Sequence, residues 1–186
     1  MADESASKDD TLPAPARRAF EGHDAFDPRP DPGTYDCVTT PFEVEATAES
    51  HENEGRDARF RLRVTVPALA AVTEEEVGPA VAEGWFDSLE RHLVDAATVA
   101  EVEPTTGPTV ERVDDRIELT VAFPAWSASA GIDDVKTIVE YIEGTYVQSV
   151  IPGYTYQSPV TGLLAAAGTR AGEDNDGDPR RGGTPL

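Results

Sequence analysis

The chain has 186 residues, of which 36 are aspartate or glutamate and 15 are lysine or arginine, so its formal net charge is −21. Only two of the basic residues, Lys8 and Lys136, are lysines. A protein that binds nucleic acid needs a basic surface that releases counterions from phosphates, and the sequence has no basic stripe of this kind. The composition therefore excludes direct binding to nucleic acid.

The excess of carboxylates together with the scarcity of lysine indicates a halophilic, haloarchaeal protein. Repulsion among the carboxylates destabilises the compact chain in dilute buffer, whereas at ~1 M salt a Debye length of ~3 Å screens most of it. The alternative is a mimic of DNA or a chaperone for basic proteins, which would gather its acids on one face. Here the acids are spread over the whole chain, which favours adaptation to salt.

The two ends of the chain are predicted to be disordered. Residues 1–13 form a polar, acidic tail and residues 169–186 have a similar composition, which leaves a single domain over 14–168. The N-terminus is acidic where a signal peptide would be basic, and no apolar run approaches the ~20 residues of a membrane span. We expect a cytoplasmic protein without membrane contact, in which Cys37, the only cysteine, is a small buried strand residue.

The first half of the domain is predicted to be a helix followed by antiparallel strands. A short helix is expected over 14–23, and three prolines break regular structure in 27–33. Apolar and polar residues then alternate, which predicts strands over 35–40, 42–49 and 59–66, each with one apolar and one polar face.

Opposite charges lie on the polar faces of the last two of these strands. Glu43 and Glu45 belong to one strand, and Arg59, Arg61 and Arg63 to the next. Opposite charges across a strand pair contribute roughly 0.2–1 kcal/mol. We therefore interpret the three arginines as partners of the glutamates and not as an anion-binding site.

A helix is predicted after these strands. Thr73 and Glu76 have the spacing of a capping box, although Pro79 predicts a kink or a later start. Apolar residues at helical spacing form its buried stripe: Val77, Val81, Trp85, Leu89 and Leu93. We expect Trp85 to pack on the inward side of the strands and Gly84 to mark a close backbone approach.

The rest of the domain is predicted to be a hairpin and two helices. Strands are expected over 110–113 and 117–123, and helices over 130–151 and 160–167. This element order predicts an α+β two-layer sandwich, with an antiparallel sheet of four or five strands and helices on one face. The order resembles that of secretion-chaperone-type domains, which commonly dimerise and bind peptides, although a shared fold does not fix a function.

Four short segments resemble an uncharacterised haloarchaeal protein family, a domain of unknown function. The segments are Thr40-Pro-Phe-Glu, Glu76-Val-Gly-Pro-Ala-Val-Ala-Glu-Gly-Trp-Phe, Tyr141-Ile-Glu-Gly-Thr-Tyr-Val and Val150-Ile-Pro-Gly-Tyr-Thr-Tyr. The resemblance covers roughly residues 14–167. It supports a single domain in a haloarchaeal cytoplasm and implies no activity, ligand or catalytic residue.

No sequence motif points to a catalytic residue, a metal site or a cofactor. His23, His51 and His92 lack the spacing of metal ligands, and no phosphate-binding glycine loop or G-x-S-x-G motif occurs. Residues 174–178 look like part of a calcium loop, but with Gly177 in its glycine position the two outermost ligand positions also fall on glycines. We expect no metal and no cofactor, and favour a protein that is not an enzyme.

The candidate binding residues are three tyrosines, Tyr146, Tyr154 and Tyr156, which lie among glycines and prolines. Tyrosine combines apolar area with a polar tip, as binding surfaces favour. The alternative is that these rings close one end of the sheet as part of the core. Aromatic residues dominate cores as well, so the sequence leaves both interpretations open.

We therefore expect a non-catalytic interaction or chaperone-like module with a protein or peptide partner, which also forms a homodimer. The alternative is a small enzyme or ligand-binding protein with a cleft between sheet and helices. A sizeable pocket with converging polar groups favours the alternative. A flat groove or a large symmetric interface favours the interaction module.

The net charge generates a first prediction, which concerns salt. The folded protein should be stable in molar KCl and lose stability progressively towards millimolar salt, because unscreened carboxylates repel one another. Thermal unfolding followed by circular dichroism over this range measures the effect. A melting temperature that does not change with KCl concentration would contradict the halophilic interpretation.

Overall fold

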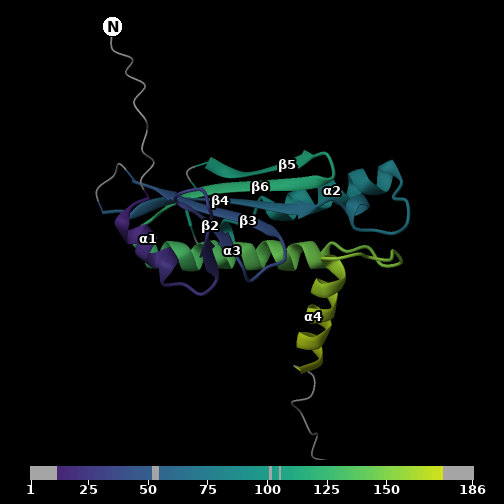
Figure 1. Cartoon of the computed structure of the whole chain (residues 1–186). Coiled ribbons are helices and arrows are strands. Elements are labelled where there is room, and N and C mark those ends of the chain that lie inside the picture. Colours follow the sequence, from purple (N-terminus) through teal and green to yellow (C-terminus); the bar gives the residue numbers. More distant parts are fainter. Residues whose placement is uncertain (1–11, 52–54, 101, 105, 174–186) are drawn as a thin grey trace, which may run out of the picture.

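The computed structural model describes residues 12–51, 55–100, 102–104 and 106–173. They form one six-stranded antiparallel sheet in the order β1-β2-β3-β4-β6-β5, with helices packed on one face (Figure 1). The fold is therefore an α+β two-layer sandwich, as predicted. It has one strand more than expected, because β1 pairs with β2 and extends that edge of the sheet. Most of the two predicted tails, 1–11 and 174–186, lies outside the described residues.

Alternating burial along the chain accounts for the strands. The strands are β1 (Phe26–Pro28), β2 (Thr34–Cys37), β3 (Glu43–Glu49), β4 (Ala58–Pro67), β5 (Thr106–Val113) and β6 (Arg116–Ala125). The helices are α1 (Ala14–Glu21), α2 (Pro79–Leu93), α3 (Ala128–Gln148) and α4 (Val160–Glu173). In the described part of the chain, no helix combines the length and the apolar character that crossing a membrane requires.

Helix α3 forms the centre of the helical layer. It packs on β4 and β6, and both α1 and α2 pack beside it. The core between the layers contains large side chains that are fully buried: Phe20, Phe60, Leu62, Leu89, Leu119, Phe123, Ile138 and Tyr146. Trp85 of α2 joins this core, as predicted, with 7% of its surface exposed. Its indole N–H donates a hydrogen bond of 2.9 Å to the carbonyl oxygen of Ser149 at the end of α3.

The start of α2 corrects one prediction. The capping box of Thr73 and Glu76 does not form, because α2 begins at Pro79 with Gly78 as an N-cap that has no side-chain hydrogen bond. Proline suits the first turn of a helix, since the amide that it lacks would have no partner there. Thr73 instead forms a β-bridge with Tyr156. The helix therefore starts late, as Pro79 indicated.

The close approach between backbone and sheet lies on a different helix from the one predicted. A Cβ atom added to Gly84 in α2 would meet nothing within 4 Å. A Cβ atom on Gly131 in α3 would lie 2.2 Å from Cε2 of Phe60 and 2.8 Å from Cβ of Ala125. Gly131 is therefore a point at which the backbone of α3 lies too close to the sheet for a side chain to fit.

Helix α4 is longer than predicted. It runs to Glu173, whereas the sequence predicted an end near residue 167 and a disordered tail from residue 169. Neither Gly168 nor the polar residues after it end the helix. Val160 and Leu163 of α4 are buried and belong to the core cluster.

Two glycines on α3 allow a matched test of this packing. Gly131→Ala should destabilise the protein by about 1–3 kcal/mol, because the added methyl group overpacks the contact with Phe60. Gly144→Ala should be neutral or stabilising by up to ~1 kcal/mol, since nothing lies within 4 Å of its Cβ and alanine favours the helix. Denaturant unfolding in molar KCl measures both. Equal effects of the two substitutions would contradict the close approach at Gly131.

Candidate functional site

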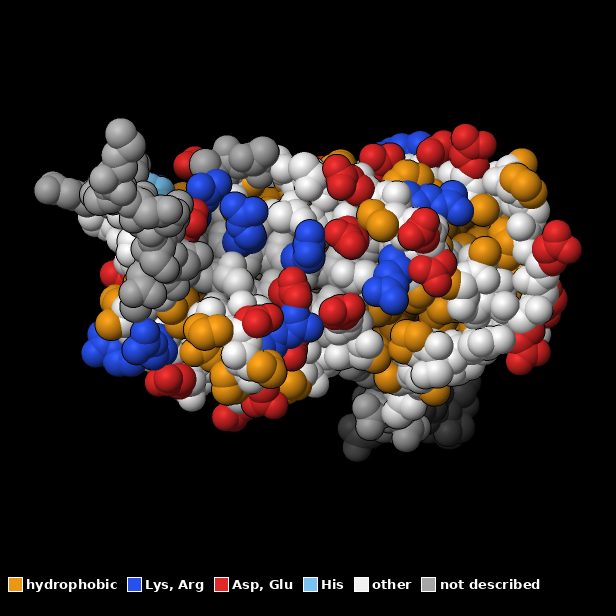
Figure 2. All heavy atoms as spheres, turned by 45° about the horizontal axis from the view of Figure 1, so that its top comes forward, with side chains coloured by type: hydrophobic (Ala, Val, Ile, Leu, Met, Phe, Trp, Pro, Cys, Tyr) orange, Lys and Arg blue, Asp and Glu red, His pale blue; other side chains and the backbone are white. Residues whose placement is uncertain are grey.

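The face of the sheet opposite the helices, which we call the open face, carries an even mixture of charges (Figure 2). The strand register and the ion pairs place five arginines and seven carboxylates on it. The arginines are Arg29, Arg59, Arg61, Arg63 and Arg116, and the carboxylates are Asp27, Asp36, Glu43, Glu45, Glu49, Glu111 and Glu118. The open face is thus close to neutral, although the chain has a net charge of −21.

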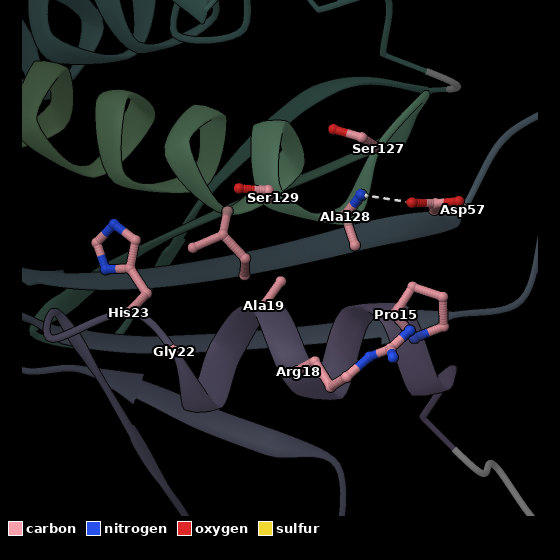
Figure 3. Close-up of a pocket in the computed structure, with 10 residues that line it drawn as sticks. Pro15, Arg18, Ala19, Gly22, His23, Asp57, Ser127, Ala128 and Ser129 are labelled. Carbon is pink, nitrogen blue, oxygen red and sulfur yellow. Dashed lines mark hydrogen bonds between the residues drawn. The ribbon is translucent and has the colours of Figure 1, made fainter.

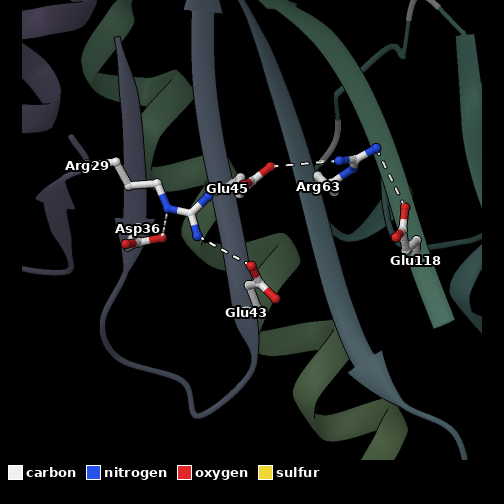
Figure 4. Close-up of polar contacts among 6 residues, drawn as sticks. All are labelled: Arg29, Asp36, Glu43, Glu45, Arg63 and Glu118. Atoms are coloured by element: carbon white, nitrogen blue, oxygen red, sulfur yellow. Dashed lines mark hydrogen bonds and ion pairs between the residues drawn. The ribbon is translucent and has the colours of Figure 1, made fainter. Parts of the chain in front are cut away.

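A network of ion pairs runs across the open face (Figure 4). The guanidinium of Arg29 lies 2.7 Å from Asp36 and 3.4 Å from Glu43, and it also pairs with Glu45. Glu45 in turn lies 4.0 Å from Arg63, which reaches Glu118 on β6 at 3.6 Å. The network connects β2, β3, β4 and β6 through side chains in addition to the backbone ladder.

The register confirms the predicted pairing of arginines with glutamates at two positions. Arg63 lies opposite Glu45, and Arg59 lies opposite Glu49 at a distance of 3.3 Å. Arg61 lies opposite Thr47 and forms no ion pair among the described residues. The prediction that all three arginines pair with glutamates is therefore wrong for Arg61.

A second candidate site is a shallow hollow of about 400 Å³ between α1 and the start of α3 (Figure 3). Its polar side chains are Arg18, His23, Asp57, Ser127 and Ser129. Three of these are engaged in holding the fold. The carboxylate of Asp57 accepts a hydrogen bond of 2.9 Å from the amide of Ala128, and the hydroxyl of Ser127 accepts one of 3.2 Å from the amide of Ala130.

His23 is the third engaged residue in this hollow. Its Nδ1 accepts a hydrogen bond from the amide of Ala25, so in the neutral ring the proton lies on Nε2. Nε2 lies 3.6 Å from Oδ1 of Asp133. Burial and the neighbouring Asp133 raise the pKa of Asp134, the next residue of α3. Of the polar side chains of the hollow, only those of Arg18 and Ser129 have no partner among the described residues and are thus able to meet a ligand.

Of the three predicted tyrosines, Tyr146 lies inside the core. Its ring is 2% exposed and packs edge-on against Phe42 and Trp85. Its hydroxyl donates a hydrogen bond of 3.0 Å to the carbonyl oxygen of Pro67, and burial raises its pKa. Tyr146 therefore does not contribute to a surface.

Tyr154 and Tyr156 lie in the loop after α3 and are both half-buried. The hydroxyl of Tyr156 accepts a hydrogen bond of 2.9 Å from the amide of Ile151 and donates one of 3.0 Å to its carbonyl. Burial raises the pKa of Tyr156. The hydroxyl of Tyr154 has no hydrogen-bond partner among the described residues. Of the three tyrosines, Tyr154 is the one with an available polar tip.

The segment before α2 holds this loop in place. The carboxylate of Glu75 accepts hydrogen bonds from the amide and the hydroxyl of Thr155, at 2.8 and 2.7 Å. These two bonds stabilise the ionised form and lower the pKa of Glu75. Backbone bonds from Glu74 to Thr155 and from Gln157 to Val72 complete the contact. The segment 72–75, which includes Thr73 of the predicted helix cap, thus positions the tyrosine loop.

Sequence reasoning missed one exposed aromatic residue, Trp126, which follows β6 and is 68% exposed. The guanidinium carbon of Arg56 lies 4.2 Å from the centre of its ring, which is a cation–π contact. The alternation of β6 contained a signal, because Phe123 and Ala125 face inward and the next residue leaves the covered face. Within the described ranges, no group of three or more histidine, cysteine or acidic side chains could hold a metal ion.

Comparison with known proteins gives a family without a function. A family model described as a family of unknown function, DUF5813, matches residues 21–166. The chain belongs to this family. The matched residues run from the end of α1 into α4, so they include the whole sheet and α3. Neither the search of curated proteins nor the search of solved structures found a match.

The tyrosine loop generates a prediction with its own control. Tyr156→Phe should cost about 1–3 kcal/mol, because it removes both hydrogen bonds to the backbone of Ile151. Tyr154→Phe should change stability by less than ~0.5 kcal/mol, as at a position without a partner. Denaturant unfolding in molar KCl compares the two variants. A larger loss for Tyr154→Phe would contradict the described geometry of the loop.

Proposed function

We propose that this DUF5813 protein is a non-catalytic interaction module that binds a protein partner through the open face of its sheet. The observation that carries the proposal is the near-neutral charge of this face in a chain with a net charge of −21. The open face spans all six strands of the sheet, and the described helices lie on the opposite side (Figure 1). It is therefore a broad, firmly supported surface.

Electrostatics supports the choice of this surface. A molecule with a large net charge repels its own copies and other acidic proteins, and the repulsion is smallest where charges of both signs alternate. In the molar salt of the proposed haloarchaeal cytoplasm, long-range repulsion is screened and short-range pairing decides which surfaces meet. The open face offers arginines and carboxylates in alternation for such pairing.

A second copy of the chain is the partner that we propose to test first. In a twofold-symmetric dimer the same patch meets itself, so a patch must carry both charges to be self-complementary. Alternating arginines and glutamates on the open face satisfy this condition. A homodimer of this kind also agrees with the element order, which resembles that of dimeric chaperone-type domains.

Thr120→Arg is the substitution that tests this surface. Thr120 lies near the middle of the open face, opposite Arg63 and Thr109, and a bulky side chain there should prevent close contact. Ala166→Arg, on an exposed position of α4, adds the same side chain elsewhere. Sedimentation velocity in molar KCl should show a dimer for the wild type and for Ala166→Arg, and a monomer for Thr120→Arg.

Two results would contradict the proposal. One is a dimer that survives Thr120→Arg, whether or not it survives Ala166→Arg. The other is a monomeric wild type that also captures no protein through the open face. Capture is measured in molar KCl with the wild type, Thr120→Arg and Ala166→Arg as baits.

If the wild type is monomeric and Thr120→Arg alone fails to capture a protein, the open face is still an interaction surface, and its partner is another protein and not a second copy of the chain.

Ligand binding is the second candidate function, and the hollow between α1 and α3 is the observation that favours it. Arg18 and Ser129 are available there, and the volume of about 400 Å³ lies in the range of small-molecule sites. Its shallow shape and the engagement of Asp57 and His23 in the fold argue for the interaction module instead.

A further inference from the structure

A smaller hollow, of about 250 Å³, lies on the open face over β2, β3 and β4. Its floor is a row of neighbouring residues across three strands, in which Thr34 lies opposite Thr47 and Thr47 lies opposite Arg61. Residues 32–33, Ala48, Glu49 and Arg59 complete its lining. Small side chains in the middle of the row leave room beside the long side chains of Arg59 and Arg61.

Several hydrogen-bond donors in this hollow are not used by the protein. Arg61 forms no ion pair among the described residues. By contrast, each of the other four arginines of the open face has at least one carboxylate partner. Arg59 gives only its Nη1 to Glu49, and its buried Nε has no acceptor. The hydroxyls of Thr34 and Thr47 have no hydrogen-bond partner among the described residues.

The exposed guanidinium of Arg61 is available to an acceptor from outside the protein, and the buried Nε of Arg59 has none inside it. A guanidinium bonds a carboxylate or phosphate with two parallel hydrogen bonds, which are about twice as strong as neutral ones. In a chain with 36 acidic residues, an arginine could have been paired by one glutamate at the opposite position. Thr47 stands there instead, and it keeps the guanidinium of Arg61 free.

The charges in the hollow select the kind of anion. Arg59 and Arg61 carry two positive charges and Glu49 carries one negative charge, so the hollow has a net charge of about +1. A carboxylate balances this charge, whereas a phosphate dianion would exceed it and meet Glu49. We propose that this hollow binds a single carboxylate group, with Arg61 as its main partner and the hydroxyls of Thr34 and Thr47 as additional donors.

The hollow lies on the open face, which the proposed dimer would cover, so acetate binding is measured on Thr120→Arg, the variant designed to be monomeric, as well as on the wild type. The carboxylate has two sources, a free small molecule or the C-terminus of a polypeptide. Acetate represents the first source. A tripeptide with a free C-terminus, compared with the same peptide as its C-terminal amide, represents the second.

The test replaces potassium chloride by potassium acetate at constant total salt and follows backbone amide signals by NMR. Saturable shifts should concentrate at Gly33, Thr34, Thr47 and Arg61. Arg61→Gln should weaken acetate binding by roughly 10-fold or more, since it removes a charged hydrogen-bond donor. Arg112→Gln removes an arginine from β5 whose position is on the opposite side of that strand, and should change the affinity less than ~2-fold.

Thr47→Val is a second variant that leaves the ion pairs of the open face intact and should weaken binding by a few-fold. The absence of saturable shifts in both the wild type and Thr120→Arg would overturn the proposal, and so would an Arg61→Gln variant that binds acetate as tightly as the protein that keeps Arg61. Phosphate that binds more tightly than acetate would overturn the choice of a monoanion. If the tripeptide with a free C-terminus binds more tightly than acetate and its amide does not bind, the carboxylate belongs to the end of a polypeptide chain. If the free tripeptide and acetate bind with similar affinities, the carboxylate belongs to a small molecule. A Thr120→Arg variant that loses its dimer but still binds acetate would separate this site from the proposed function.

Discussion

The contact between α3 and the covered face of the sheet is the constraint on which the other features depend. Gly131 lets α3 approach so closely that a single Cβ atom would meet Phe60 and Ala125. The carboxylate of Asp57, in the segment before β4, then caps the start of α3, and the indole of Trp85 binds the backbone at its end. Because α3 is fixed at both ends, α1 and α2 are held beside it and the tyrosine loop begins at a defined place. The whole helical layer is thus assigned to one face, and the opposite face is left without a helix.

This division of the faces also sorts the charges. A strand with one face on the core must place its polar residues on the other face. The antiparallel register then brings arginines of β4 next to glutamates of β3 and β6, so that Arg59 and Arg63 meet carboxylates while Arg61 does not. A single exposed pair contributes little to stability, typically 0–1 kcal/mol, but Arg29 and Glu45 each take part in more than one pair. The network therefore contributes more to the shape and charge of a surface than an isolated pair would.

The sequence predicted the fold well where one periodicity was sufficient. Alternation located β3, β4 and β6, and a helical stripe located α3, including its buried residues Val135, Ile138 and Ile142. The predictions from the sequence were wrong where a local structure depends on contacts between segments far apart in the chain. The spacing of Thr73 and Glu76 is correct for a capping box, but the loop after α3 competes for the same segment through Thr155 and Tyr156. In the same way, Gly84 and Gly131 look alike in the sequence, and only the packing of α3 on Phe60 distinguishes them.

The candidate sites show the same limit. Tyrosines between glycines and prolines are recognisable in a sequence. That pattern does not distinguish Tyr146, whose hydroxyl donates a hydrogen bond to the carbonyl oxygen of Pro67, from Tyr154, whose hydroxyl has no partner among the described residues. The arginine without an ion pair among the described residues, Arg61, could be predicted in part. Residues 43, 45 and 49 are glutamates and residue 47 is threonine, so the arginine opposite residue 47 must lack a carboxylate on β3. Which arginine this is depends on the register, because a shift of two residues would pair Arg61 with Glu45 or Glu49 and leave a different arginine opposite Thr47. Such a shift keeps Phe60 and Leu62 on the covered face, so the alternation of buried residues does not distinguish these registers, and the position of the proposed carboxylate site follows only from the strand pairing in the structure.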